Sequence, residues 1–330
     1  MLHVLNGDAT RMKLEQSGIL GEMTVWADVL HDGPVLDLAP GEFRQVRASH
    51  LSTMTAHSAD DIRIQLEQWD AALERYADHD ELVFWFEHDL FDQLALVRHL
   101  HWLSAIDRRS TRFSLICIGA FPGVDNFTGL GPLSPAQLAS LFPARVPITD
   151  EEVSLGRGTW ELFRSPDPRP LAKVAGADGA TPLPFLKGAL RRHLEDFPSS
   201  RDGLARSERQ ILNAVADQPR SAGELFVATQ RMEERVFMGD LSFWSIARRL
   251  ATGPRPLLRC DEWPALVPRQ GPPLSLTDAG QAVLAGDADH INMNGIDRWM
   301  GGVHLTAGEH WRISNALDLI RSGGPASDRS

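Results

Sequence analysis

The stretch Leu82-Val83-Phe84-Trp85-Phe86 decides the fold that this sequence predicts. Five consecutive apolar residues suit a strand that is covered on both faces, which is typical of the parallel sheets of α/β proteins. Glu87-His88-Asp89 follow directly. Because unpaired charge is costly inside a sheet, we expect this cluster at the carboxyl end of the strand, where open α/β sheets bind their ligands.

The same arrangement occurs twice nearer the start of the chain. Residues 2–5 are apolar or strand-like and precede Asn6-Gly7-Asp8, and residues 23–26 precede Asp28, His31 and Asp32. If these runs belong to one parallel sheet, all three polar clusters lie at the same edge. The sequence therefore predicts a site, but it does not name the substrate.

Strand-like and helix-like segments alternate over residues 1–125. A fourth strand is expected at 113–118, Ser58 with Asp61 matches a capping box before a helix, and a second helix is expected over 91–106. Gly33-Pro34 and Pro40-Gly41 are typical of a loop. This alternation predicts an α/β domain with a Rossmann-like parallel sheet.

The rest of the chain predicts two further parts. Residues 126–200 carry helix-start signals at Ser134-Pro135 and at Thr149 with Glu152 but no strand pattern, so we expect a helical connector. Residues 205–320 show three helix patterns and then two short strand patterns, which predicts a winged-helix-like C-terminal domain. The composition of residues 322–330 predicts a disordered tail.

Charge is unevenly distributed along the chain. Residues 1–125 contain 20 Asp and Glu against 10 Lys and Arg, whereas residues 126–330 contain 24 against 23. An acidic first part disfavours binding to a phosphate backbone there and favours a cation, a metal or a cationic substrate.

The two cysteines indicate the compartment in which the protein is expected. Cys117 and Cys260 form neither a CxxC pair nor a disulfide framework, which is typical of reduced thiols in a cytoplasmic protein. No apolar run approaches the ~18 residues of a membrane span, and no signal-peptide pattern precedes the first strand. We expect a cytoplasmic protein with no membrane partner, and the sequence leaves its oligomeric state open.

Glu87-His88-Asp89, with Asp92 and Gln93 one helical turn later, is the densest polar cluster of the chain. An imidazole among carboxylates is typical of acid/base chemistry, and grouped carboxylates are typical ligands of a divalent cation. The expected catalytic residues are His88, His31 and Asp28. The expected substrate-binding residues are Asn6, Gly7, Asp8, Asp92 and Gln93, and the expected ligands of a divalent metal are Asp8, Glu87 and Asp89.

Several of these residues have a structural alternative. Asp8 and Asp89 could serve only as helix caps, and Asp32 before Gly33 is typical of a turn. We interpret His99 as a packing or surface residue. Trp299-Met300-Gly301-Gly302 allows a close backbone approach, which favours a role in domain packing.

Nucleic-acid binding by the winged-helix-like part is a further possibility. Arg248, Arg249 and Arg259 lie in it, but acidic residues are interleaved with them: Glu224, Glu233, Glu234 and Asp240. Because readers of nucleic acid usually show a clear basic excess, this pattern disfavours the interpretation.

Three motifs resemble those of the bacterial "domain of unknown function 1835" family. They are Asn6-Gly7-Asp8, the segment 26–34 (WADVLHDGP) and the segment 85–94 (WFEHDLFDQL). The segments 276–286 and 299–302 are similar to the C-terminal companion domain of that family. The resemblance spans nearly the whole chain and implies its architecture and candidate positions, but no reaction.

These patterns favour an enzyme, a hydrolase or group transferase acting on a small polar, possibly phosphorylated, substrate. In this hypothesis His88 or His31 is the acid/base, and the carboxylates hold a divalent metal or orient the imidazoles. The alternative is a ligand-sensing regulator whose winged helix binds nucleic acid.

Overall fold

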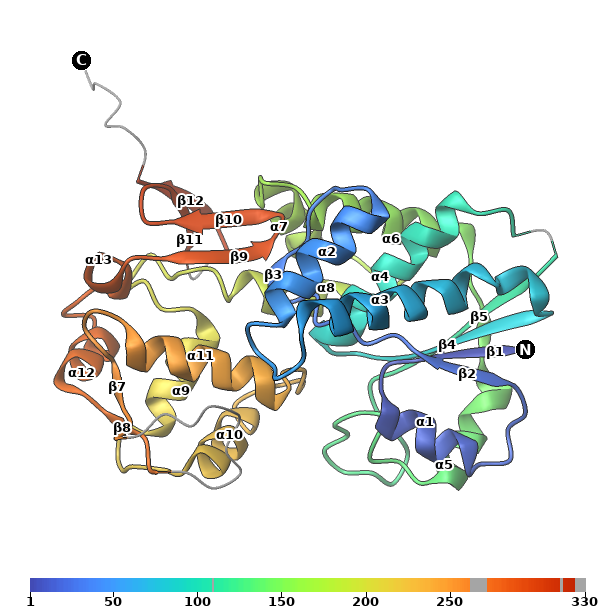
Figure 1. Cartoon of the computed structure of the whole chain (residues 1–330), viewed down its shortest axis with the longest axis horizontal. Coiled ribbons are helices and arrows are strands. Elements are labelled where there is room, and N and C mark those ends of the chain that lie inside the picture. Colours follow the sequence, from blue (N-terminus) through green and yellow to red (C-terminus); the bar gives the residue numbers. More distant parts are fainter. Residues whose placement is uncertain (109, 262–271, 315–316, 324–330) are drawn as a thin grey trace, which may run out of the picture.

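The computed structural model describes residues 1–108, 110–261, 272–314 and 317–323 (Figure 1). Its main sheet has five strands in the order β2-β1-β4-β5-β6. Four strands are parallel: β1 (Leu2–Leu5), β2 (Glu22–Val25), β4 (Glu81–Glu87) and β5 (Arg112–Ile118). The predicted α/β class with a parallel sheet is therefore confirmed.

Helices cover both faces of this sheet, which explains why every residue of β4 is buried. Phe84 and Phe86 lie in the larger core with α4 (Leu90–Ala105) and α6 (Asp150–Phe163), and Val83 and Trp85 lie in a smaller core with α1 (Asp8–Glu15) and α5 (Pro135–Leu141). Figure 1 shows α1 and α5 on one side of the strands and α2, α3, α4 and α6 on the other. Helix α2 spans Pro40–Leu51, and α3 spans Ala59–Glu74.

Helix starts agree with the capping patterns where these are strong. Capping boxes are formed at Ser58 with Asp61, at Ser134 with Gln137 and at Thr149 with Glu152. The loop expected at Pro40-Gly41 is wrong, because α2 begins at Pro40, and proline fits the first helical position. The strand-free connector is also wrong in one place, since β6 (Val146–Pro147) pairs antiparallel with β5.

A second core is built from residues 204–283. It contains α9 (Arg206–Ala214), α10 (Ala222–Gln230), α11 (Asp240–Thr252), the antiparallel pair β7 (Leu258–Arg259) and β8 (Ser275–Leu276), and α12 (Asp278–Ala285). The connector supplies α7 (Arg169–Gly176) and α8 (Leu186–Leu194), and the short 3₁₀ helices η1 and η2 span Tyr76–Asp78 and Phe142–Ala144.

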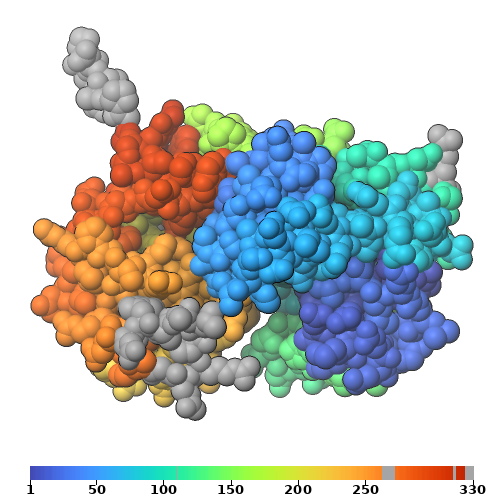
Figure 2. Space-filling model, in the orientation of Figure 1, coloured from blue at the N-terminus to red at the C-terminus, as the bar shows by residue number. Residues whose placement is uncertain are grey.

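The last strands return to the first core. After α13 (His290–Asn294) come β9 (Asp297–Gly301), β10 (Val303–Thr306), β11 (His310–Ile313) and β12 (Leu319–Ser322). Strand β9 pairs in parallel with β3 (Gly33–Pro34), which the sequence analysis placed in a loop. In Figure 2 the red C-terminal strands meet the blue layer that holds β3 and α2. Of the tail predicted at 322–330, Ser322 ends β12 and residues 324–330 lie outside the described residues.

Gly301 and Gly302 allow the C-terminal strands to approach the backbone at the end of α6 closely. The amide of Gly302 donates to the carbonyl of Phe163 at 2.9 Å, and a Cβ at either glycine would collide with the backbone at the end of α6. The close backbone approach expected for these glycines is therefore confirmed. Among the described residues, no helix combines the length and the apolar character that crossing a membrane requires.

Candidate functional site

The site lies at the topological switch point of the sheet, where the strand order changes side: β2 is added on one side of β1, and β4 on the other. Strand β1 pairs with β2 on one side and β4 on the other, and Leu5 lies opposite Trp85. Such a change of side opens a crevice at the carboxyl ends of the two strands. Asn6 follows β1 there, and Glu87 ends β4, so two polar clusters that are distant in sequence lie together.

Asn6 joins these clusters through its side chain. Its Nδ2 donates to Oε1 of Glu87 at 2.8 Å and to Oδ2 of Asp92 at 2.9 Å, and its Oδ1 accepts from Oγ1 of Thr10 at 3.0 Å. Both protons of the amide and its oxygen are thus used, which fixes its orientation. Of these residues, sequence analysis missed only Thr10.

Three carboxyl groups form the centre of the site: Glu87, Asp89 and Asp92, called the carboxylate trio below. One oxygen of each lies within 4.8 Å of the others. Their side chains are almost fully buried, and Oδ1 of Asp92 has no hydrogen-bond partner in the part of the chain that the structure describes. Asp89 also caps α4, because its Oδ1 accepts the amide of Asp92 at 3.1 Å. The cap alternative and a place in the trio are therefore compatible.

Burial and mutual repulsion both act on the trio. Burial raises the pKa of Glu87, burial and then the Glu87 charge raise the pKa of Asp89 to about 7, and burial with both neighbouring charges raises the pKa of Asp92 well above its ordinary value. Among the described residues, no lysine or arginine forms an ion pair with any of the three. Such a group either retains protons or binds a cation.

A backbone amide and a side-chain amide also hold Glu87 in place. The amide of Leu130 donates to its Oε1 at 2.5 Å, and Nε2 of Gln93 donates to its carbonyl at 2.6 Å. A Cβ at Gly129, where φ is +139°, would collide with the Glu87 carboxylate. The 129–130 segment thus covers this carboxylate with backbone alone. It lies in the expected helical connector, and no motif signal there pointed to the site.

His88 separates Glu87 from Asp89 in the sequence, and its ring packs near two aromatic rings. The ring centroids of Phe127 and Phe185 are 5.8 and 5.9 Å from its imidazole, and its buried Nδ1 has no hydrogen-bond partner among the residues described. Burial and then the charge of Arg235 lower the pKa of His88 to about 4, so the imidazole is neutral at pH 7. Arg235 also donates to the His88 carbonyl at 3.1 Å.

Asp8 and Gly7 lie at the start of α1 and do not belong to the trio. Gly7 is the N-cap residue of α1 and Asp8 is already its first helical residue, so the expected cap by Asp8 is wrong. The Asp8 carboxylate is 71% exposed and pairs with Arg11 at 2.9 Å. Asp92, rather than Asp8, completes the carboxyl group cluster.

Asp28 lies in a buried ion pair. Nη2 of Arg47 is 2.6 Å from Oδ1 of Asp28, and neither side chain is exposed. The same guanidinium donates to the carbonyls of Val29, Asp32 and Pro34. Arg47 therefore ties the β2–β3 segment to α2, and this duty accounts for Asp28 without catalysis. No sequence signal connected the two, because α2 was not expected.

The neighbours of His31 are not members of the trio. Its ring lies 5.0 Å from that of Phe237 and 6.3 Å from that of Phe91. Burial lowers its pKa to about 4, and the charges that act on it are those of Asp32, Asp196, Arg47 and Arg192. Asp32 itself pairs with Nε2 of His50 at 3.1 Å. The structure thus joins the first and third polar clusters and leaves the second outside them.

No protein-family model matches the chain, and no curated protein matches it either. The functional argument therefore rests on the geometry of the site.

Proposed function

We propose that the chain is an enzyme that holds a divalent cation at the carboxylate trio and catalyses hydrolysis or group transfer on a small polar, phosphorylated substrate. The observation that carries the proposal is the trio itself: three buried carboxyl groups with one oxygen of each within 4.8 Å of the others, and no ion pair to a described basic side chain. Hard divalent cations such as Mg²⁺ and Mn²⁺ prefer oxygen ligands of this kind. The unpartnered Oδ1 of Asp92 fits a ligand atom.

The position of the trio supports this proposal. We interpret the sheet as Rossmann-like and residues 204–283 as winged-helix-like, in keeping with the proposed membership of the "domain of unknown function 1835" family. In open α/β sheets, ligands bind at a switch point of this kind. A bound cation would polarise a substrate oxygen, and the neutral imidazole of His88 would accept or deliver a proton beside it.

A cavity beside the first turn of α4 supports an anionic substrate. It measures about 240 Å³ and its lining includes Leu90, Arg191 and Arg235. The side chains of Arg191 and Arg235 donate to backbone carbonyls, and neither forms an ion pair with a carboxylate among the described residues. Guanidinium groups in this state suit a phosphate.

One feature weighs against the regulator alternative. In a winged helix the third helix enters the groove of the duplex. Here Ser242 and Ile246 of α11 line a narrow cavity together with Trp299 of β9, so part of this helix faces the rest of the chain. The enzyme proposal does not require α11 to be accessible to a nucleic-acid duplex.

Metal binding is tested with Mn²⁺ and three proteins. The wild type and Asp8→Asn should bind Mn²⁺ alike, because Asp8 is exposed and paired with Arg11. Asp92→Asn should bind roughly tenfold more weakly or worse, because it removes one charged ligand. Isothermal titration measures the affinities. A wild type that binds Mn²⁺ no better than Asp92→Asn would contradict the metal site.

Turnover is tested separately with a panel of small phosphorylated compounds and Mn²⁺, by release of inorganic phosphate. We expect His88→Ala to lower kcat by roughly 100-fold or more while Mn²⁺ affinity is unchanged. Failure of the wild type to turn over any compound, or a variant as active as the wild type, counts against the assigned chemistry.

A further inference from the structure

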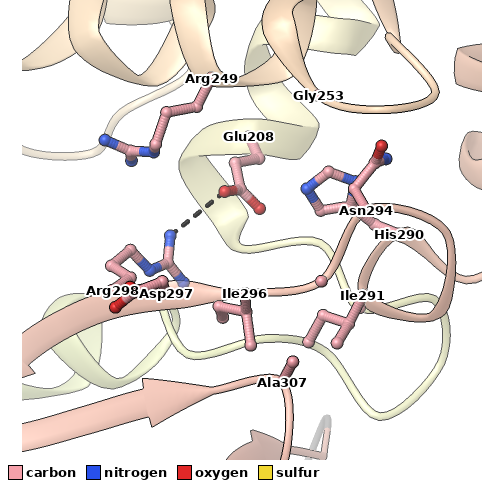
Figure 3. A pocket seen from close by; sticks show the side chains of 12 residues that line it. Glu208, Arg249, Gly253, His290, Ile291, Asn294, Ile296, Asp297, Arg298 and Ala307 are labelled. Atoms are coloured by element: carbon pink, nitrogen blue, oxygen red, sulfur yellow. Dashed lines mark hydrogen bonds and ion pairs between the residues drawn. The ribbon is translucent and has the colours of Figure 1, made fainter.

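A second pocket, of about 390 Å³, lies where the second core meets β9. Figure 3 shows its lining side chains: Glu208 from α9, Arg249 from α11, His290 and Asn294 from α13, and Arg298 from β9. Its volume lies in the range of small-molecule sites, and junctions between separately packed parts are a common place for such sites. It shares no residue with the carboxylate trio or its surroundings.

Arg249 is the basic group of this pocket that forms no ion pair among the described residues, and the charges of Asp32, Glu208 and Asp196 act on it from a greater distance. Within the described part of the chain, its guanidinium makes one hydrogen bond, from Nη1 to Oγ of Ser245 at 3.2 Å, and no ion pair. Arg298 differs, because its Nη1 pairs with Glu208 at 3.2 Å and its Nη2 donates to the carbonyl of Asp196 at 2.8 Å. Arg249 therefore retains donors whose planar arrangement fits a carboxylate or phosphate group.

His290 adds an oriented donor. Oδ1 of Asn294 accepts the amide of Arg255 at 2.8 Å, so the Asn294 nitrogen is the group that faces Nδ1 of His290 at 3.2 Å. Since that nitrogen donates, Nδ1 accepts, and the proton of the neutral ring lies on Nε2. Figure 3 shows the ring of His290 pointing into the space between α11 and β9.

A neighbouring cavity contains an unsatisfied side chain. This narrow cavity of about 30 Å³ shares Glu208, Arg249 and Arg298 with the pocket, and its own lining includes His31. Both ring nitrogens of His31 are buried and have no hydrogen-bond partner among the described residues. A buried polar atom left without a partner costs about 1–3 kcal/mol. A bound polar molecule would supply that partner.

The charges around the pocket decide its ligand class. The acid Glu208 is paired with Arg298, and Asp297 is paired with His304 at 2.7 Å. Asp32 and Asp196 line the neighbouring cavity, where Asp32 pairs with His50 and Asp196 pairs with Arg192 at 3.0 Å. Their charges also act on Arg249. Within the described ranges, Arg249 has one hydrogen bond and no ion pair, and Nε2 of His290 has no partner, so both can donate to a ligand. We infer that this pocket binds a small molecule through a carboxylate or phosphate group, with Arg249 pairing with the anion and His290 donating a hydrogen bond.

The test compares two neighbouring arginines on the same helix. Arg249→Gln removes the proposed anion partner, and Arg248→Gln is the matched control because Arg248 is the neighbouring residue of α11 and does not line the pocket. Affinities for inorganic phosphate and for citrate are measured by titration at constant ionic strength, without divalent cations. The two probes distinguish a phosphate ligand from a carboxylate ligand.

We expect the wild type and Arg248→Gln to bind at least one probe alike, and Arg249→Gln to bind it roughly tenfold more weakly or worse. His290→Phe should weaken binding by a smaller factor. Equal affinity of Arg249→Gln and wild type, equal weakening by Arg248→Gln, or no binding of either probe to the wild type would overturn the inference. The same titration of Asp92→Asn separates anion binding at this pocket from metal binding at the trio. That variant should bind the probes as the wild type does.

Discussion

At the scale of single residues, the ion pair of Asp28 and Arg47 is the clearest case of a polar pair that serves the fold. Both side chains are inaccessible, and Arg47 also bridges three carbonyls. Removing one partner leaves a buried charge without compensation. We expect Arg47→Met to lower the free energy of unfolding by about 3–5 kcal/mol.

Urea unfolding measures this loss, and Arg11→Met is the control. Arg11 forms an exposed pair with Asp8, and such pairs contribute about 0–1 kcal/mol. Equal effects of the two substitutions would show that the Asp28 pair does not stabilise the fold as its burial indicates.

His99 predicts how stability depends on pH. Its ring lies among Trp26, Phe84 and Phe86, with centroids 4.9, 5.2 and 5.5 Å away, and burial lowers its pKa well below the ordinary value. The unfolded chain takes up this proton near pH 6.5 and the folded chain does not, so stability falls as the pH drops through that value.

We therefore expect His99→Leu to reduce the loss of stability between about pH 7.5 and pH 5, because leucine takes up no proton in the unfolded state. At the higher pH the two proteins should agree within about 1.5 kcal/mol, since the volumes are similar. Urea midpoints at both values measure this. An unchanged pH dependence would show that His99 is protonated in the folded protein.

The sequence predicted the residues at the switch point because a pattern marks them. An apolar run that ends in charged residues indicates a strand end, and this signal led to Asn6, Glu87, Asp89 and Asp92. It also led to Asp28, whose partner Arg47 lies in a helix that the pattern did not show. A single sequence shows which residues are polar, but not which of them form hydrogen bonds or ion pairs with one another.

At the scale of elements, we expect the backbone conformation of the 129–130 segment, which covers Glu87, to affect metal binding at the trio. Gly129 has a φ that side chains rarely adopt, and a Cβ there would collide with the Glu87 carboxylate. Gly129→Ala should therefore displace Glu87 and weaken Mn²⁺ binding by roughly tenfold.

Gly131→Ala is the matched control in the same loop. Its Cβ would lie 3.4 Å from that of Ala9, which is an ordinary contact. Titration with Mn²⁺ should therefore separate the two variants. If both bind as the wild type does, the loop does not position Glu87.

The predicted elements were reliable where the signal is local. Capping-box patterns predicted the starts of α3 and α6, Ser134-Pro135 predicted the start of α5, and the apolar run predicted β4. Helix α2 was missed because Pro-Gly is typical both of turns and of a first helical turn. The strands β3, β6 and β9–β12 were missed because they have two to five residues and depend on partners elsewhere.

At the scale of the whole molecule, the first core includes both ends of the described chain. Met300, Val303, Leu305 and Ile313 belong to the same buried cluster as the residues of β1 and β4. The sequence placed residues 205–320 in one C-terminal part because pairing between β3 and β9 leaves no local trace. The buried contacts therefore divide the chain at about residue 296 as well as at about residue 204.

This division predicts the effect of truncation. A chain ending at Gly295 lacks β9–β12, so we expect faster hydrogen exchange in β4 and α6 of the first core and little change in α10 of the second. A chain ending at Gly323 retains these strands and is the control. Unchanged exchange in α6 after the first truncation would show that the C-terminal strands do not stabilise the first core.

The pairing of Gly33 with Met300 also bears on biosynthesis. A ribosome that adds roughly 5–20 residues per second needs on the order of 10–50 s between these two positions. Throughout that interval the emerging N-terminal layer lacks its C-terminal strands, and its apolar surface is exposed to whatever surrounds the nascent polypeptide. Chaperone capture during translation is thus a direct consequence to expect of this strand pairing.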